Sequence, residues 1–104
     1  MSVYGSGEIV SAATTSGAGA HSVTKNKTIS NPSSAAAVFL QLPAASSVND
    51  YTDYVIKDGK GDAGSNNITI TTAGGTIDGS ANTTISSNYG ALVFTSDGTN
   101  WHII

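Results

Sequence analysis

Few side chains in this sequence could take part in catalysis or metal binding, and the two histidines are the first candidates. His21 and His102 lie far apart in the chain, and there is no cysteine. Transition metals favour histidine, cysteine and carboxylate ligands at short spacings, and neither histidine has such neighbours. His102 stands between Trp101 and Ile103 in an alternating segment, so its side chain is expected to face away from the core. We therefore predict two surface histidines and no metal site.

The segment DGKGD at residues 58–62 superficially resembles a calcium-binding loop. Calcium takes about six to eight oxygen ligands, and an EF-hand loop ends in a bidentate glutamate. Here Lys60 stands between the two acids, and no such glutamate follows. The pattern favours a solvated turn, with an irregular calcium site as the alternative.

The other polar residues form no recognisable catalytic pattern. Gly74-Gly75 lacks the Lys-Ser/Thr of a phosphate-binding loop. Glycoside hydrolysis needs two carboxylates flanking a cleft, but nearly all of the seven Asp and Glu residues lie at turn-like positions. No serine or threonine is placed beside a histidine in a nucleophile elbow. We assign no catalytic residue, no cofactor and no metal ligand, and we expect no enzymatic activity.

Aromatic side chains offer a different kind of chemistry, because exposed rings stack on sugars. The four candidates are Tyr51, Tyr54, Tyr89 and Trp101. Core packing is the stronger interpretation for Tyr54 and Trp101, which belong to alternating apolar segments. Tyr51 and Tyr89 flank such segments, and the sequence leaves their placement open.

The composition limits the partners of the chain. Its 104 residues suffice for one domain, and only 11% are charged, with no arginine and a net charge of −3. Binding to nucleic acid or to anionic lipid depends on clustered cations, so four Lys in a net-negative chain argue against both partners. No segment approaches the length of a membrane span.

The start of the chain lacks the features of an export signal. Residues 1–20 have neither a basic start nor a long apolar run. We therefore expect synthesis in a cytoplasm with no export address. The Asn-x-Thr triplets at Asn26, Asn67 and Asn82 are accordingly interpreted as chance matches to the glycosylation sequon.

Two regions differ in character. Residues 1–20 are small and rich in Gly and Ser, which predicts a flexible or extended N-terminal arm containing at most a brief strand at residues 8–10. Residues 21–104 are predicted to form an antiparallel β domain. Strands are expected at residues 21–29, 35–42 (with a short helix as the alternative), 54–57, 67–72, around 77 and 85, and at 91–95 and 101–104.

Short strands separated by Gly-rich turns indicate an all-β fold, a small antiparallel β-sandwich or barrel-like module. Large apolar side chains are few, and Ala supplies much of the 38% hydrophobic content. A monomer is therefore expected to be marginally stable, so association with copies of itself or with a larger surface would add burial.

Five short segments occur in an order that is distinctive as a set. They are residues 42–45 (LPAA), 54–58 (YVIKD), 67–70 (NITI), 76–79 (TIDG) and 96–104 (SDGTNWHII). Over about residues 39–104 this pattern resembles bacteriophage structural proteins, including tail-fibre tips, head fibres and decoration (cement) proteins. The resemblance implies a compact antiparallel β module, often trimeric, that lies on virions and has no catalytic residues.

The length separates these possibilities, because 104 residues leave no room for a fibre shaft. We expect a capsid decoration or cement protein, or a short head fibre, that is made in the bacterial host cytoplasm and lies on the virion surface. Its expected partners are itself, as a homotrimer, and the major capsid protein or another virion protein, contacted through residues 1–20. The alternative is a tail-fibre or head-fibre tip that binds a host-surface glycan.

Overall fold

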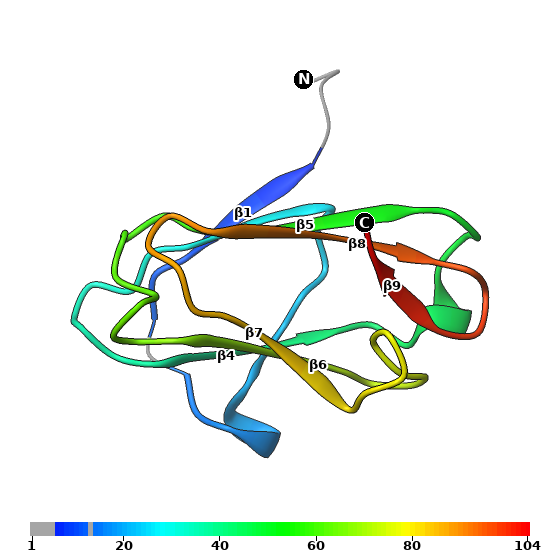
Figure 1. Cartoon of the computed structure of the whole chain (residues 1–104), viewed down its shortest axis with the longest axis horizontal. Coiled ribbons are helices and arrows are strands. Elements are labelled where there is room, and N and C mark those ends of the chain that lie inside the picture. Colours follow the sequence, from blue (N-terminus) through cyan, green and yellow to red (C-terminus); the bar gives the residue numbers. More distant parts are fainter. Residues whose placement is uncertain (1–5, 13) are drawn as a thin grey trace.

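Two facing β-sheets make up the fold in the computed structural model, which describes residues 6–12 and 14–104 (Figure 1). The strands are β1 (Gly7–Val10), β2 (His21–Ser22), β3 (Lys27–Ser30), β4 (Val38–Leu42), β5 (Asp53–Asp58), β6 (Ile68–Thr72), β7 (Asn82–Ile85), β8 (Ala91–Ser96) and β9 (Trp101–Ile103). Two short 3-10 helices, η1 (Gly17–Gly19) and η2 (Ala45–Ser47), lie between strands. The all-β class expected from the sequence is confirmed.

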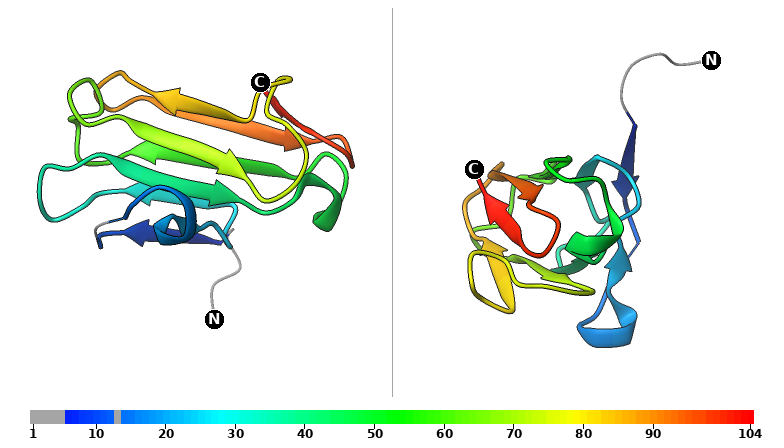
Figure 2. Two further views of the ribbon diagram at one scale, coloured as in Figure 1. Left: turned by 90° about the horizontal axis from the view of Figure 1, so that it is seen from below. Right: turned by 90° about the vertical axis from the view of Figure 1, so that its right-hand side faces the viewer.

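The expected antiparallel arrangement is wrong for four strand pairs. One sheet has the order β1-β3-β5-β8-β9 and the other β2-β4-β6-β7. The pairs β1–β3, β3–β5, β2–β4 and β4–β6 are parallel, and only β5–β8, β8–β9 and β6–β7 are antiparallel. The reason is that the first six strands alternate between the sheets. Each strand therefore returns to its own sheet in the same direction as before. Figure 2 shows the molecule from two further sides.

This alternation also corrects the predicted strand at residues 21–29. The segment divides into β2, which pairs with β4, and β3, which pairs with β1 and β5 in the other sheet. Alternating polarity continues across a chain crossing, so it cannot reveal where one strand ends and the next begins.

An N-terminal arm over residues 1–20 is not supported by the described part of that region. β1 pairs in parallel with β3 over four residues, and Val10 is buried in the core. The Thr14 hydroxyl accepts a hydrogen bond from the backbone N–H of Phe39 at 2.8 Å. The rest of the prediction concerns residues 1–5 and 13, which lie outside the described residues.

The core forms between the sheets from residues that alternate inward along the central strands. Its largest fully buried apolar side chains are Leu40, Leu42, Ile56, Ile68, Ile70, Ile77, Phe94 and Trp101. The strand predicted at residues 67–72 is confirmed as β6, with Ile68 and Ile70 buried, and the strand predicted at residues 35–42 is present in its last five residues as β4. Among the described residues, no helix is long and apolar enough to cross a membrane.

Candidate functional site

The indole of Trp101 ties the two sheets together at one end of the fold. The side chain is fully buried, and its Nε1 donates to the carbonyl oxygen of Pro43 at 3.0 Å and to Thr72 Oγ1 at 3.1 Å. Tyr54 packs edge-to-face against it, with ring centroids 5.3 Å apart. The predicted core placement of both aromatic residues is confirmed.

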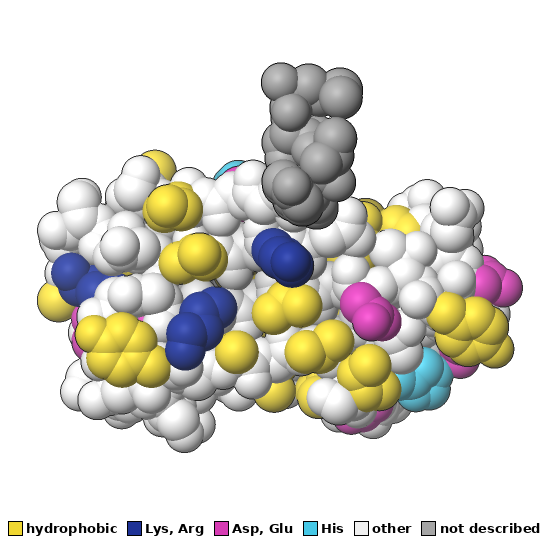
Figure 3. All heavy atoms as spheres, turned by 90° about the horizontal axis from the view of Figure 1, so that it is seen from above, with side chains coloured by type: hydrophobic (Ala, Val, Ile, Leu, Met, Phe, Trp, Pro, Cys, Tyr) yellow, Lys and Arg dark blue, Asp and Glu magenta, His cyan; other side chains and the backbone are white. Residues whose placement is uncertain are grey.

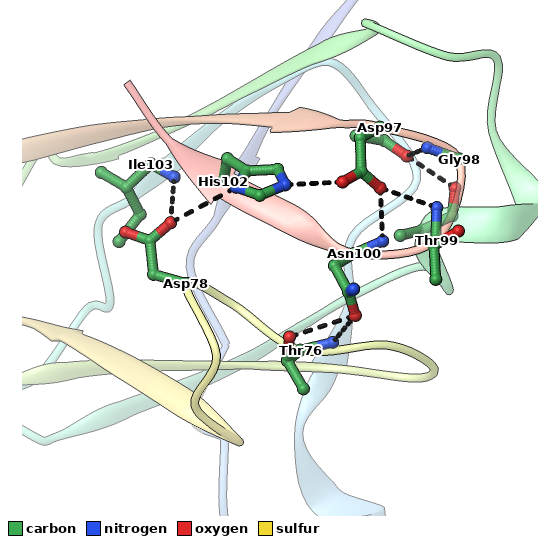
Figure 4. Close-up of polar contacts among 10 residues, drawn as sticks. Thr76, Asp78, Asp97, Gly98, Thr99, Asn100, His102 and Ile103 are labelled. Carbon is green, nitrogen blue, oxygen red and sulfur yellow. Dashed lines mark hydrogen bonds and ion pairs between the residues drawn. The ribbon is translucent and has the colours of Figure 1, made fainter.

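The turn before Trp101 is organised by the Asp97 carboxylate. Its Oδ1 accepts the backbone N–H groups of Thr99 at 2.9 Å and Asn100 at 2.8 Å, and its Oδ2 lies 2.7 Å from His102 Nε2 (Figure 4). The Asn100 side-chain oxygen in turn accepts the backbone N–H and the hydroxyl of Thr76. This loop therefore holds both its own hairpin and the chain after β6.

His102 lies on the surface between two carboxylates. Its side chain is 48% exposed, so the predicted outward orientation is confirmed. Its Nδ1 lies 3.8 Å from Asp78 Oδ1, and that same oxygen accepts the backbone N–H of Ile103 at 3.2 Å. We call this set, Pro43, Thr72, Thr76, Asp78 and residues 96–103, the closing end. It is a network of hydrogen bonds that joins β9, a strand of the five-stranded sheet, to Pro43 and Thr72 at the four-stranded sheet and to the chain that follows β6.

The Asp97 network predicts a specific acid response. Hydrogen bonds from the backbone of Asn100, from His102 and from the backbone of Thr99 lower the pKa of Asp97 to about 2, from an ordinary 3.8. A carboxylate with a depressed native pKa stabilises the fold above the unfolded-state pKa, and this contribution is lost as the pH falls through the native pKa. The free energies of unfolding of the wild type and of Asp97→Asn should therefore differ at pH 5 and converge between about pH 4 and pH 2.

Urea unfolding followed by the fluorescence of Trp101 at several pH values measures this convergence. His102→Gln should keep part of the acid response, because the hydrogen bonds from the backbone N–H groups of Asn100 and Thr99 remain. Parallel pH curves for the wild type and Asp97→Asn would contradict the prediction.

The second histidine is paired at the opposite edge of the five-stranded sheet. His21 Nε2 lies 2.9 Å from Glu8 Oε1, which connects β2 in one sheet to β1 in the other. Since β1 and β9 are the two edges of their sheet, His21 and His102 do not come together. Among the described residues, no group of three or more His, Asp or Glu side chains is arranged to hold a metal ion.

Asp58 corrects the prediction of a solvated turn at residues 58–62. The side chain is only 2% exposed, and its oxygens accept the backbone N–H groups of Gly61, Ala63 and Tyr89 at 2.9 to 3.1 Å. Burial by itself raises the pKa of the Asp58 carboxyl group. The hydrogen bonds from backbone N–H groups together lower this pKa by more, so that it lies below the ordinary value of 3.8. The sequence did not predict that Asp58 joins two loops, because one of its donors, Tyr89, lies 31 residues further along the chain.

The four aromatic side chains do not form one platform. Tyr51 and Tyr89 are 76% and 59% exposed, and both have positive φ angles, of 64° and 59°. Tyr51 precedes β5, whereas Tyr89 lies beyond its far end, beside Lys57. The turn at Gly74-Gly75 is structural, because Gly75 has a φ of 86° and the Thr99 carbonyl oxygen occupies the place of a side chain.

A groove on the outer face of the five-stranded sheet was not predicted. It has a volume of about 360 Å³ and is lined by Gly7, Glu8, Ile9, Lys27 and Ile29. Its residues come from β1 and β3, which are distant in the sequence but paired in parallel. A lone Ile-Val pair in a Gly-rich segment is too weak a signal to place this groove from the sequence. We call it the edge groove.

Comparison with known proteins identifies no family for the chain. No protein-family model matches it, and no curated protein sequence matches it. A function therefore has to be argued from the surfaces and contacts of the chain itself.

Proposed function

We propose that the chain is a non-enzymatic structural protein of a bacteriophage particle, a capsid decoration or cement protein that associates with copies of itself and with capsid subunits. The observation that carries this proposal is the exposed apolar outer face of the five-stranded sheet. Exposed apolar surfaces of this kind mark sites of protein association.

This outer face combines apolar side chains with lysines (Figure 3). Ile9 and Ile29, side by side on β1 and β3, are 65% and 41% exposed. Val55 and Val93 are outward-facing cross-strand neighbours on β5 and β8. Burying such a row against a neighbouring subunit would contribute about 25 cal/mol per Å² of apolar area.

The overall dimensions are those of an ordinary small domain. The radius of gyration is 12.9 Å, close to the roughly 13 Å typical of 100-residue domains. The two sheets thus pack as an ordinary small domain does, and association depends on a particular surface rather than on a general lack of burial.

The closing end supports the phage resemblance at the level of the fold. Three of the five segments that carry the resemblance, residues 42–45, 76–79 and 96–104, are linked there by hydrogen bonds, although Pro43 and Trp101 lie 58 residues apart in the chain. The bonds run from Trp101 to Pro43, from Thr76 to Asn100 and from Ile103 to Asp78. These three segments therefore occur together because they close one end of the sandwich, and they do not identify the partner.

Light scattering of the purified protein from micromolar to nanomolar concentration tests the proposal, and a trimer is expected. The double variant Val55→Thr/Val93→Thr retains β-branched side chains but loses apolar surface, so the concentration at which the trimer dissociates should rise at least tenfold. Thr84→Ser, which removes a methyl group from the other sheet, should leave it unchanged.

Cosedimentation with expanded empty capsids of the phage that carries the gene provides the second readout. We expect binding at stoichiometric occupancy. A protein that remains monomeric at micromolar concentration and does not sediment with capsids would overturn the proposal.

A fibre tip that binds a host-surface glycan is the second candidate, and Tyr89 is the residue that favours it. Its ring is exposed, with Lys57 Nζ 5.6 Å from the ring centroid, and its positive φ is held by the contact with Asp58. Strained exposed residues often occur at binding sites. Sedimentation with host polysaccharide in place of capsids, lost in Tyr89→Asn, would favour this candidate, since Asn tolerates the same φ.

A further inference from the structure

We propose that the open edge of β1 binds an extended strand of the partner protein, with an acidic side chain opposite Gly7 and an apolar side chain opposite Ile9. This inference rests on the proposed function and names the kind of segment that the partner contributes. Strand addition supplies affinity through main-chain hydrogen bonds, while alternate side chains supply specificity.

β1 is an open edge among the described strands, and it differs from β7, the other four-residue edge without lysine or proline, because β7 exposes only Asn and Thr side chains. β1 is the terminal strand of the five-stranded sheet, and its sequence GEIV contains neither lysine nor proline. Natural proteins usually shield sheet edges with such residues, or with very short strands. β9, at the other edge, has only three residues and is engaged by Asp78, and β2 has only two. β1 instead presents a largely exposed isoleucine.

The edge groove exists because Gly7 has no side chain. Gly7 is in register with Lys27, and Ile9 is in register with Ile29. A Cβ placed on Gly7 would lie 3.6 Å from the Cβ of Lys27, so the two positions are adjacent on the same face. An outward side chain of an added strand would enter this space, with Ile9 and Ile29 at one side and Lys27 at the other.

The charges around the groove select an acidic side chain for the position opposite Gly7. No side chain of β1 stands between Lys27 and the open edge, because the intervening position is Gly7. Glu8 points inward instead, where it pairs with His21. Within the described strands β1, β3 and β5, the outward positions in register with the groove carry Lys27, Lys57 and apolar residues, and the one outward acid, Asp53, lies two residues before Val55 and outside this register.

The β1 strand of a second copy would not present this pattern on the outward face of the sheet. That strand would present Gly7 and Ile9 outward, with no carboxylate to meet Lys27. The groove therefore matches a strand of another protein in which an acidic residue and an apolar residue are two positions apart, so that both face outward.

Titration of the ¹⁵N-labelled full-length protein with synthetic peptides tests this inference. Two capped octapeptides of Ser and Thr carry a valine two positions from either an aspartate or a lysine. Amide shifts in β1 and β3 are expected with the aspartate peptide, and its affinity should exceed that of the lysine peptide at least tenfold. Lys27→Glu should reverse this preference. Lys60→Glu, with the same charge change in the loop after β5, should not.

Gly7→Val provides an independent test, because it fills the groove. We expect at least a tenfold loss of affinity for both peptides, with a far-UV circular dichroism spectrum like that of the wild type. Should Gly7→Val fail to fold, the charge reversal at Lys27 still decides the question.

Three results would overturn the inference while leaving the proposed function standing if capsids are still bound. The first is no shift in β1 with either peptide. The second is a shift in β1 that follows protein concentration alone, which would identify a second copy as the occupant. The third is hydrogen exchange at β1 as slow as in the core without any peptide, which would mean that the edge is already covered within the chain.

Discussion

Asp58→Asn should lower the free energy of unfolding by about 3 kcal/mol. The carboxylate is almost fully buried and accepts the backbone N–H groups of Gly61, Ala63 and Tyr89. Hydrogen bonds to a charged group contribute about 1.5 to 3 kcal/mol each, and leaving a buried donor unpaired costs a similar amount. An asparagine keeps one acceptor oxygen but turns an NH₂ group toward the remaining donors.

Such a loss is large beside the roughly 5 to 15 kcal/mol of a typical domain. It should be localised as well, because Asp58 connects the loop after β5 to the turn that holds Tyr89. Amide exchange at Ala63 and Tyr89 should therefore accelerate more than exchange in β4 or β6.

The pH dependence of the same variant has a defined sign. The native pKa of Asp58 lies below its ordinary value, so the unfolded chain binds the proton more readily. The contribution of Asp58 is present at neutral pH and is lost as the pH falls below the unfolded-state pKa. Asp58→Asn should therefore lose less stability on acidification than the wild type does.

Urea unfolding at pH 7, monitored by the fluorescence of the single tryptophan, measures the effect. Asp62→Asn is the matched control, because Asp62 lies in the same loop and its carboxylate accepts a side-chain hydrogen bond from Asn66. We expect the control to cost under about 1 kcal/mol. Equal losses for the two variants would show that Asp58 does not organise the loops.

Trp101→Ala should destabilise the protein by about 4 kcal/mol, the usual range for removing a buried aromatic side chain being about 3 to 5 kcal/mol. The indole is fully buried, packs against Tyr54, and links β9 to Pro43 and Thr72 of the other sheet. Its removal leaves a cavity and removes the side-chain hydrogen bonds to Pro43 and Thr72, while the bonds of Asn100 to Thr76 and of Ile103 to Asp78 remain.

Trp101→Phe separates packing from hydrogen bonding. It keeps an aromatic ring near Tyr54 but loses the Nε1–H donor, so a loss of about 2 kcal/mol is expected from the unpaired acceptors and the smaller volume. His102→Ala, on the exposed face of the same strand, should cost under about 1 kcal/mol. Far-UV circular dichroism follows urea unfolding in all three variants, because two of them lack the fluorophore. If the Trp101→Ala variant were as stable as the His102→Ala variant, the Trp101 side chain would not be what holds the closing end to the other sheet.

Residue alternation explains how much of the fold could be predicted. Because side chains of a strand point to opposite faces in turn, the pattern around Ile68 and Ile70, and that of Trp101 with His102, determines which side chains are buried. The same pattern contains no information on which strands pair, and a hairpin is the simplest connection for short strands. That default failed for β1 to β6, where each connection crosses to the other sheet.

Contacts between distant residues account for what was missed at the candidate sites. The Asp58–Gly59 dipeptide indicates a turn, and the strand indeed ends there. Its carboxylate is buried because Tyr89 arrives from the connection between β7 and β8. Likewise, Glu8 and His21 pair because β1 and β2 lie at the same side of the two sheets.

The sequence by itself determined the class of the fold, the inward residues of the central strands, the turns and the outward position of His102. These properties follow from local backbone preference and from the period of two along a strand, both of which operate over a few residues. Only the tertiary structure decided the parallel pairing, the burial of Asp58 and the edge groove. Each of these requires segments 19 or more residues apart to meet, and that meeting depends on how the whole chain crosses between its two sheets.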